Sequence, residues 1–260
     1  MIAGFIQNDP VFGDKQHNFK QVFALAGNIR ADLLVLPELF ATGYTFTSVD
    51  EAASLAEPVD GPTAQFLSEL SSLTGAAVVA GFIEQDGKAL YNSSLIVSGN
   101  QTLGTYRKIH LFNREKLWFS TGNKAPEVFE AAGCRIGVMI CFDWFFPETA
   151  RTLAFKGAQV IAHPSNLVMP YCQRSMPVRC LENRVFAITA NRIGREIRGP
   201  DDFHFTGASQ VTGHKGDILL QAPTDRPHVA LVEFDPALAD DKNLNDHNHL
   251  FNDRRTDLYR

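Results

Sequence analysis

The sequence has little that would place the protein in a membrane, on nucleic acid or outside the cell. Its first ten residues, MIAGFIQNDP, lack the basic start of a signal peptide. No apolar run approaches the roughly 20 residues of a membrane-spanning helix. The formal net charge is −5, so the chain has no basic excess with which to bind nucleic acid or anionic lipid. We therefore expect a cytoplasmic protein that acts on a small molecule, with no nucleic-acid and no membrane partner.

Cysteine is also scarce, with four in 260 residues. No two of them form the CxxC pair that is typical of zinc sites and dithiol redox sites. Because there is no export signal, we expect free thiols in a reducing compartment. The four are Cys134, Cys141, Cys172 and Cys180.

The bulk composition is that of a globular chain with a sizeable core. Hydrophobic residues make up 45% of the sequence and charged residues 20%. The chain has no internal repeat, no low-complexity tract and no linker that would divide it. We therefore predict a single domain over residues 1–260, with a C-terminal arm from about 240 to 260.

Short apolar runs alternate with amphipathic segments along the chain. Strands are predicted at 2–7, 32–38, 76–85, 89–98, 104–112, 134–141, 159–165, 185–192, 208–221 (with a central turn) and 228–235. Helices are predicted at 18–30, 61–75, 147–156 and 175–184. Interleaved helices and strands indicate an α/β fold. Short turns between some strands, such as Asp86-Gly87, indicate mixed rather than parallel sheets.

Three reactive side chains lie at the ends of predicted strands. Glu38 follows LLVLP, Lys108 ends GTYRK, and Cys141 follows RIGVMI. Ligands of α/β proteins bind at the carboxyl ends of strands, so the three could share a site. A thiol can attack a carbonyl carbon, a carboxylate can transfer protons, and an ammonium can stabilise an oxyanion. The set predicts covalent acyl-transfer chemistry; core packing of the cysteine and surface positions for the two charges are the alternatives.

The surroundings of Cys141 favour a working thiol. Pro147 suits the first turn of a helix, so the cysteine would lie just before a helix start. Backbone N–H groups there lower the pKa of a thiol and can bind an oxyanion. Strand alternation puts Arg107 on the opposite face from Lys108, so only one of the two can reach a shared site.

These residues resemble the signature blocks of the nitrilase superfamily of carbon–nitrogen hydrolases. The matching blocks are LPEL (36–39), YRKIHL (106–111), ICFD (140–143) and FPE (146–148), with further similarity at HPSN (163–166), ENR (182–184) and RRTDLY (254–259). Residues 107–119 and 162–171 are most similar to archaeal nitrilase-like amidases and their bacterial relatives.

The resemblance implies a four-layer α-β-β-α sandwich with two mixed sheets, assembled as a homodimer or a higher oligomer. It implies that Cys141 is the nucleophile, that Glu38 is the general base, and that Lys108 binds the oxyanion together with the backbone N–H of Phe142. It also implies that Glu115 is a second glutamate that positions substrate and supports the lysine. The expected reaction is amide hydrolysis through a cysteine thioester, with no metal and no cofactor because lysine supplies the positive charge.

The residues after the cysteine bear on the choice of substrate. True nitrilases of this superfamily usually have Cys-Trp-Glu, whereas this chain has Cys141-Phe142-Asp143, which favours an amide over a nitrile. No arginine follows shortly after the cysteine to bind a substrate carboxylate, although Arg174 or Arg179 could supply one from elsewhere. The candidate substrate-binding residues are Phe142, Trp144, Phe145, Tyr44, Trp118 and Asn166. The aromatic residues near the expected catalytic positions, Phe40, Tyr44, Trp118, Trp144 and Phe145, suit an apolar or cationic substrate.

We therefore expect hydrolysis of a small primary amide. CFDWFFPE is also similar to the elbow of N-carbamoylputrescine amidases, so carbamoyl and nitrile substrates remain alternatives. A histidine base, His110 or His163, is a third, but no feature of the sequence fixes either ring near Cys141. A catalytically silent relative that acts as a binding or scaffold protein is a fourth, disfavoured because all four expected catalytic residues are present. Residues 41–50 are a candidate lid.

Overall fold

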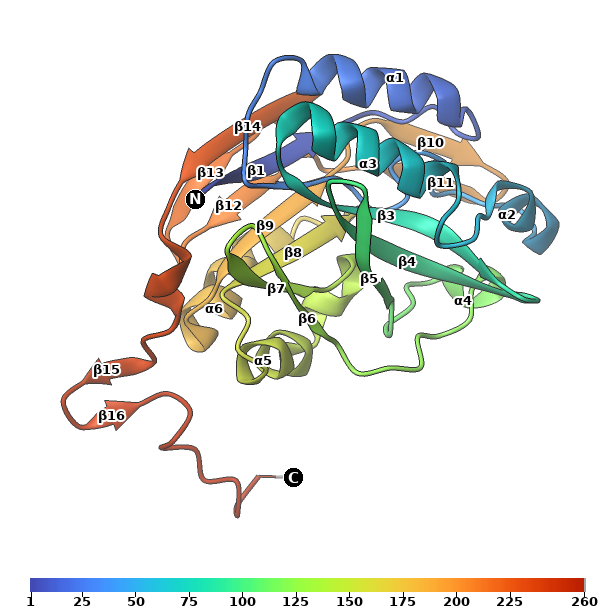
Figure 1. Ribbon diagram of the computed structural model, residues 1–260. Helices are drawn as coiled ribbons and strands as arrows, with labels where there is room; N and C mark the ends of the chain where they lie inside the picture. Colours follow the sequence, from blue (N-terminus) through green and yellow to red (C-terminus); the bar gives the residue numbers. More distant parts are fainter. Residues whose placement is uncertain (260) are drawn as a thin grey trace.

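The computed structural model describes residues 1–259 and contains two six-stranded sheets packed face to face (Figure 1). From edge to edge the first sheet contains β14 (His228–Glu233), β1 (Ile2–Gln7), β2 (Leu33–Val35), β3 (Ala77–Asp86), β4 (Ala89–Ser98) and β5 (Gln101–Arg107). The second contains β13 (Ile218–Gln221), β12 (Gln210–Thr212), β9 (Phe186–Asn191), β8 (Val160–Ser165), β7 (Cys134–Val138) and β6 (Val128–Ala131). Strands β1 to β3 run parallel, as do β7 to β9, and the other pairings are antiparallel. The predicted α/β fold with two mixed sheets is confirmed.

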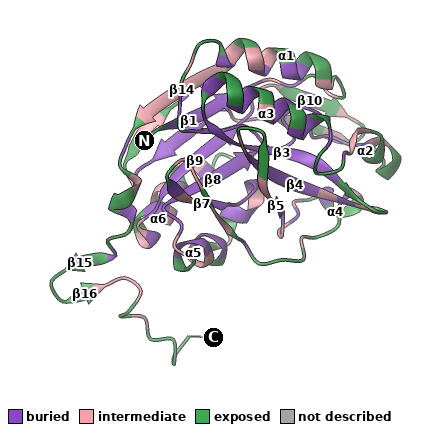
Figure 2. Ribbon diagram, in the orientation of Figure 1, coloured by how far each residue is buried: buried purple, intermediate pink, exposed green. Residues whose placement is uncertain are grey.

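Helices cover the outer faces of both sheets and complete the four predicted layers. Helices α1 (Lys15–Ala26) and α3 (Pro62–Thr74) lie over the first sheet, and α5 (Pro147–Phe155) and α6 (Cys172–Asn183) over the second (Figure 1). Apolar side chains of both sheets meet in one core, which includes Phe5, Val35 and Val79 from the first and Ile136, Ile161 and Ile188 from the second. Figure 2 shows the consequence: the central strands are buried, and the outward faces of the helices are exposed.

Local sequence explains most of the element boundaries. All three residues of β2 are buried, as expected of a central parallel strand that is covered on both faces. Helix α3 has Pro62 in its first turn and ends at Gly75, whose φ of 77° suits glycine. Helix α1 begins three residues before the predicted start, because the Asp14 side chain accepts a hydrogen bond from the His17 N–H and caps the helix.

Several short elements were not predicted. They are α2 (Val49–Leu55), α4 (Glu115–Trp118), β6, the hairpin of β10 (Arg195–Arg198) and β11 (Asp201–His204), the 3₁₀ helices η1 (Cys141–Phe145) and η2 (Pro236–Ala239), and the ribbon of β15 (Asn243–Asn245) and β16 (Asn248–His249). The candidate lid, residues 41–50, does not form a single loop. Residues 41–46 are buried, and Ser48 is the N-cap of α2.

The C-terminal segment leaves the sandwich and runs along its lower side (Figure 1). Lys242 Nζ donates hydrogen bonds to the carbonyls of Asn183 and Arg184 at the end of α6. Farther on, the Phe251 ring lies 4.5 Å from the Phe155 ring of α5, measured between centroids. Across residues 1–259, no helix combines the length and the apolar character that crossing a membrane requires.

Candidate active site

All four predicted catalytic residues lie just after strands or at the starts of short helices. Glu38 follows β2, Lys108 follows β5, Glu115 begins α4 and Cys141 begins η1 after β7. All four are buried, with exposed fractions of 0%, 1%, 4% and 5% in that order. Buried charges are costly unless they are paired, so the contacts among these groups decide what the site can do.

Lys108 joins the two glutamates. Its Nζ donates to Oε1 of Glu38 and to Oε1 of Glu115, each at 2.7 Å. Burial lowers the pKa of Lys108, but the carboxylates of Glu115 and Glu38 outweigh it, so the pKa is raised and the ammonium stays charged. Arg107 faces away and pairs with Glu84, as strand alternation predicts.

Glu38 has one oxygen in this network and one free. Its Oε1 also accepts a hydrogen bond from Asn92 Nδ2 on β4 at 2.7 Å, whereas its buried Oε2 has no hydrogen-bond partner in residues 1–259. Burial raises the pKa of Glu38 to about 7, Lys108 opposes the rise and Glu115 adds to it. A carboxyl group with such a pKa can accept a proton in one step and donate it in the next.

The backbone holds Glu38 closely against β3. The Gly81 N–H donates to the Pro37 carbonyl at 3.1 Å, and a Cβ added at Gly81 would lie 2.5 Å from Glu38 Cα. Only glycine permits this approach. The next residue, Leu39, has a φ of 48°, a left-handed value that costs a non-glycine residue about 1 kcal/mol.

Cys141 also has left-handed backbone, with a φ of 40°. Strained residues of this kind concentrate at functional sites. Burial raises the pKa of the thiol well above its ordinary value; the charge of Glu38 adds to this, and Lys108 and the backbone N–H of Asn166 oppose it. The sequence argument for a thiol pKa lowered by a helix start is therefore wrong, because burial outweighs it. Near neutral pH the thiol is therefore protonated, and Glu38 is the charged group that affects its pKa most.

Asp143 anchors the turn that carries the cysteine. Its carboxylate accepts hydrogen bonds from the Ile140 N–H at 2.9 Å, the Tyr106 hydroxyl at 2.8 Å and the His110 N–H at 3.1 Å. The contacts tie η1 to the end of β5, so the cysteine turn and the Lys108 strand are fixed relative to each other. Helix α5 beyond it has no side-chain cap, because Phe146 occupies the cap position.

Neither candidate histidine base has a described contact with the thiol. His163 lies on the Cys141 carbonyl, with Nε2 at 2.9 Å, and burial lowers the pKa of its ring to about 4. His110 Nδ1 lies 2.7 Å from Asp143 Oδ1, and its ring stacks on Phe146. Both rings therefore support the backbone around the cysteine.

The predicted substrate-binding residues occupy different environments. The Tyr44 hydroxyl donates to Glu115 Oε1 at 2.6 Å, and Tyr44, Glu115, Trp118 and Phe203 line one small cavity. The backbone N–H of Asn166 contacts the Cys141 thiol; its side chain is buried, and neither polar atom of that side chain has a partner in the described chain. Phe142 lines a separate surface cavity with His110 and Phe146. Trp144 is buried in the main apolar core, and Phe145 is exposed at the surface.

Sequence reasoning missed Asn92 and Asp143, which orient the catalytic groups. Both have a recognisable position in the sequence: Asn92 interrupts the apolar strand ALYNSSLIV, and Asp143 is two residues after the cysteine. These positions do not reveal which side chain each residue contacts; Asn92 and Glu38, for example, are 54 positions apart.

Known proteins are similar to this chain over nearly its whole length. A profile of the carbon-nitrogen hydrolase family matches residues 2–242. The chain is 45% identical to a Pyrococcus abyssi protein named nitrilase, over 99% of this chain and 98% of the relative. It is 31% identical to an N-carbamoylputrescine amidase of Arabidopsis thaliana, over 88% and 83%. A solved amidase structure from Nesterenkonia AN1 superposes with a TM-score of 0.80 at 25% identity, over 99% and 95%.

Proposed function

The chain belongs to the carbon–nitrogen hydrolase family, and from that premise we propose that it hydrolyses a small primary amide to a carboxylic acid and ammonia through a thioester on Cys141. The observation that carries the proposal is the buried ammonium of Lys108 shared by Glu38 and Glu115 beside the cysteine. It offers a base, an oxyanion-stabilising cation and a nucleophile within one enclosed cluster.

In the first half-reaction, the Glu38 carboxylate takes the thiol proton and Cys141 Sγ attacks the amide carbon. A carbon–sulfur bond forms, and the carbonyl electron pair moves to oxygen. The oxyanion is stabilised by the Lys108 ammonium and the backbone N–H of Phe142. Glu38 then gives its proton to the nitrogen, the carbon–nitrogen bond breaks and ammonia leaves.

In the second half-reaction, Glu38 takes a proton from water while the water oxygen attacks the thioester. The carbon–sulfur bond breaks as the tetrahedral intermediate collapses, and the thiolate recovers its proton from Glu38. Glu115 keeps the lysine oriented through both halves, and the pKa of about 7 suits the two roles of Glu38.

We assign substrate binding first to Asn166. A buried carboxamide with no partner costs free energy, and its one acceptor and one donor group complement a primary amide. Tyr44 and Trp118 would contact the rest of the substrate from the aromatic side of the small cavity.

A neutral substrate suits the charges of this cavity best. Both of its lining carboxylates are compensated, since Glu115 pairs with Lys108 and Asp201 lies 3.2 Å from Arg114 Nε. Arg179 is also engaged, since it donates to the Trp144 carbonyl and pairs with Glu182. N-carbamoylputrescine is the second candidate, because a relative carries that activity in its name and Trp118 and Tyr44 could hold an amine.

The test is ammonia release from aliphatic and aromatic primary amides, N-carbamoylputrescine, omega-amides of dicarboxylates and simple nitriles. Wild type should prefer a neutral amide, and Cys141→Ala should lose at least about 10³-fold in kcat because it lacks the nucleophile. Cys134→Ala is the matched control, since it removes a buried thiol outside the cluster and should keep the activity.

Each other outcome has a distinct meaning. Ammonia release that survives Cys141→Ala would refute the thioester route. A preference for N-carbamoylputrescine or for nitriles would replace the neutral amide as substrate. No turnover of any of these compounds by folded wild type would favour the binding-protein alternative.

We also propose a homodimer that acts in the cytoplasm. Val178 and Leu181 lie on one face of α6, Tyr171 at its N-cap continues that face, and each of the three is about half exposed. A second copy of this face is the simplest cover for such an apolar stripe.

The proposed cytoplasmic location rests on the cysteines, because four free thiols suit a reducing compartment.

A further inference from the structure

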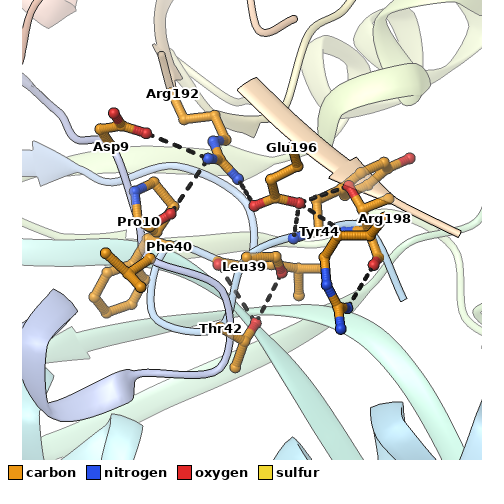
Figure 3. A network of polar contacts seen from close by, with 12 residues as sticks. Asp9, Pro10, Leu39, Phe40, Thr42, Tyr44, Arg192, Glu196 and Arg198 are labelled. Atoms are coloured by element: carbon orange, nitrogen blue, oxygen red, sulfur yellow. Dashed lines mark hydrogen bonds and ion pairs between the residues drawn. The ribbon is translucent and has the colours of Figure 1, made fainter. Parts of the chain in front are cut away.

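A buried ion pair joins Arg192, which directly follows β9, to Glu196 of the β10–β11 hairpin. Arg192 and Glu196 have exposed fractions of 1% and 6%, and Arg192 Nη1 pairs with Glu196 Oε1 (Figure 3). The guanidinium also donates to the Ile193 carbonyl at 3.0 Å and the Pro10 carbonyl at 3.4 Å. One oxygen of Glu196 is thus committed to an arginine that is itself fixed.

The other oxygen of Glu196 holds the segment that carries Tyr44. Glu196 Oε2 accepts hydrogen bonds from the N–H of Tyr44 at 3.1 Å, the N–H of Thr45 at 2.8 Å and the Thr45 hydroxyl at 2.6 Å (Figure 3). A Cβ added at Gly43 would lie 2.8 Å from Glu196 Oε1, so the segment is pressed against the carboxylate. Three donors on one charged oxygen define the position of this backbone closely.

The segment in turn presents a hydroxyl to the catalytic cluster. Tyr44 Oη donates to Glu115 Oε1, the same oxygen that accepts from Lys108 Nζ. Lys108 divides its hydrogen bonds between Glu115 and Glu38. An unbroken series of contacts therefore runs from Glu196 through Tyr44 and Glu115 to the ammonium.

We propose that Glu196 is a positioning residue for the hydrolysis, which holds Tyr44 so that its hydroxyl keeps Lys108 balanced between Glu115 and Glu38. The inference rests on the proposed function, because it assigns Lys108 and Glu38 their roles in that reaction. When the Tyr44 hydroxyl is withdrawn, Glu115 Oε1 loses a donor and attracts the ammonium more strongly. Lys108 then moves away from Glu38 and from the oxyanion that it stabilises.

Other charge pairs of the same hairpin do not make this connection. Arg195 and Asp202 pair at the surface, and Arg198 pairs with Glu51 of α2 while donating to the Thr45 carbonyl. These contacts attach the hairpin. Glu196 instead binds the N–H of the residue whose side chain reaches Glu115.

The test compares Glu196→Gln with Asp202→Asn, which makes the same chemical change at an exposed site of the same hairpin. Glu196→Gln should lower kcat by about 10–100-fold with a smaller change in KM, because it displaces the reacting groups and, of the proposed substrate contacts, only Tyr44. The acid limb of the kcat/KM profile of Glu196→Gln should move to higher pH, because Lys108 moves away from Glu38. Glu38 is faced by Lys108, Glu115, Cys141 and Tyr44, and of these the lysine holds its pKa down.

Tyr44→Phe should move the acid limb in the same direction, and the double variant should move it no farther than Tyr44→Phe alone. Asp202→Asn should leave kcat and the limb unchanged. If Glu196→Gln does not fold, Thr45→Val removes one hydrogen bond from the same carboxylate and should give a smaller shift of the same sign.

The rate of Cys141 alkylation by iodoacetamide against pH gives a second readout that needs no substrate. The pH dependence of this rate should shift in Glu196→Gln and in Tyr44→Phe, and it should not shift in Asp202→Asn. A wild type that is alkylated but hydrolyses no amide would refute the proposed function. The alkylation rates of the variants would still test the role of Glu196. Unchanged pH profiles in a folded Glu196→Gln, with or without a lower melting temperature, would overturn the inference and leave the ion pair a purely structural role.

Discussion

Glu38 determines how the reaction should depend on pH. Burial raises the pKa of its carboxyl group to about 7, and the proposed base is active only when ionised. Below that pH the proton is already bound, so kcat/KM should fall about tenfold for each pH unit. A profile from pH 5 to 9 should therefore show an acid limb near neutrality.

Glu38→Gln should lose about 10²–10⁴-fold in kcat and lose the acid limb as well, since no titrating base remains. Glu148→Gln is the control, because Glu148 is an exposed carboxylate in the first turn of α5. An acid limb that persists unchanged in Glu38→Gln would assign the titration to another group.

At this scale the sequence identified the reactive groups and not their partners. Glu38, Lys108 and Cys141 were predicted from their places at strand ends, and the structure brings the two charged groups into contact beside the thiol. Glu115 was expected only through the family resemblance. The role inferred for Glu196 needs contacts with Tyr44 across 152 positions, which no local pattern contains.

Among the elements, η1 depends on a single carboxylate. Asp143→Asn would place an amide N–H₂ against at least one of the donors that now bind the carboxylate. The substitution should therefore lower the free energy of unfolding by about 1–3 kcal/mol, and it should also lower kcat. Urea unfolding and ammonia release measure the two effects.

Tyr106→Phe is the matched comparison, because it removes one donor and keeps the carboxylate. It should cost less than Asp143→Asn in both measurements. Equal activity of wild type and Asp143→Asn would show that the cysteine turn keeps its shape without this anchor.

The elements that were predicted have a strong pattern, and those that were missed have a weak one. Apolar runs identified the long strands, and Pro62 and Gly75 bounded α3. The hairpin REIRGPDDFH is polar on both strands, so its alternation is hidden, and tertiary contacts such as the Arg114–Asp201 ion pair hold it in place. Helix α2 has only seven residues, too few to show a helical period.

For the whole molecule, the proposed dimer predicts a mass in solution of twice 28.8 kDa. Val178→Glu would bury a charge in the stripe on α6 and should shift the mass toward that of the monomer. Val11→Glu is the control at a residue of similar exposure away from this helix. Light scattering after size-exclusion chromatography measures both, and a monomeric wild type would contradict the proposal.

The pairing of β1 with β14 determines when the growing chain can finish folding. β1 is synthesised long before its antiparallel neighbour β14, to which it is also joined by the Met1 amine, which donates to the Phe234 carbonyl at 2.7 Å. Until β14 has been made, β1 has an open edge of N–H and C=O groups that can pair with strands of other nascent chains. The sheet that carries Glu38 and Lys108 is thus completed only after every strand of the second sheet has been made, and slow translation between β1 and β14 should favour aggregation of the nascent chains.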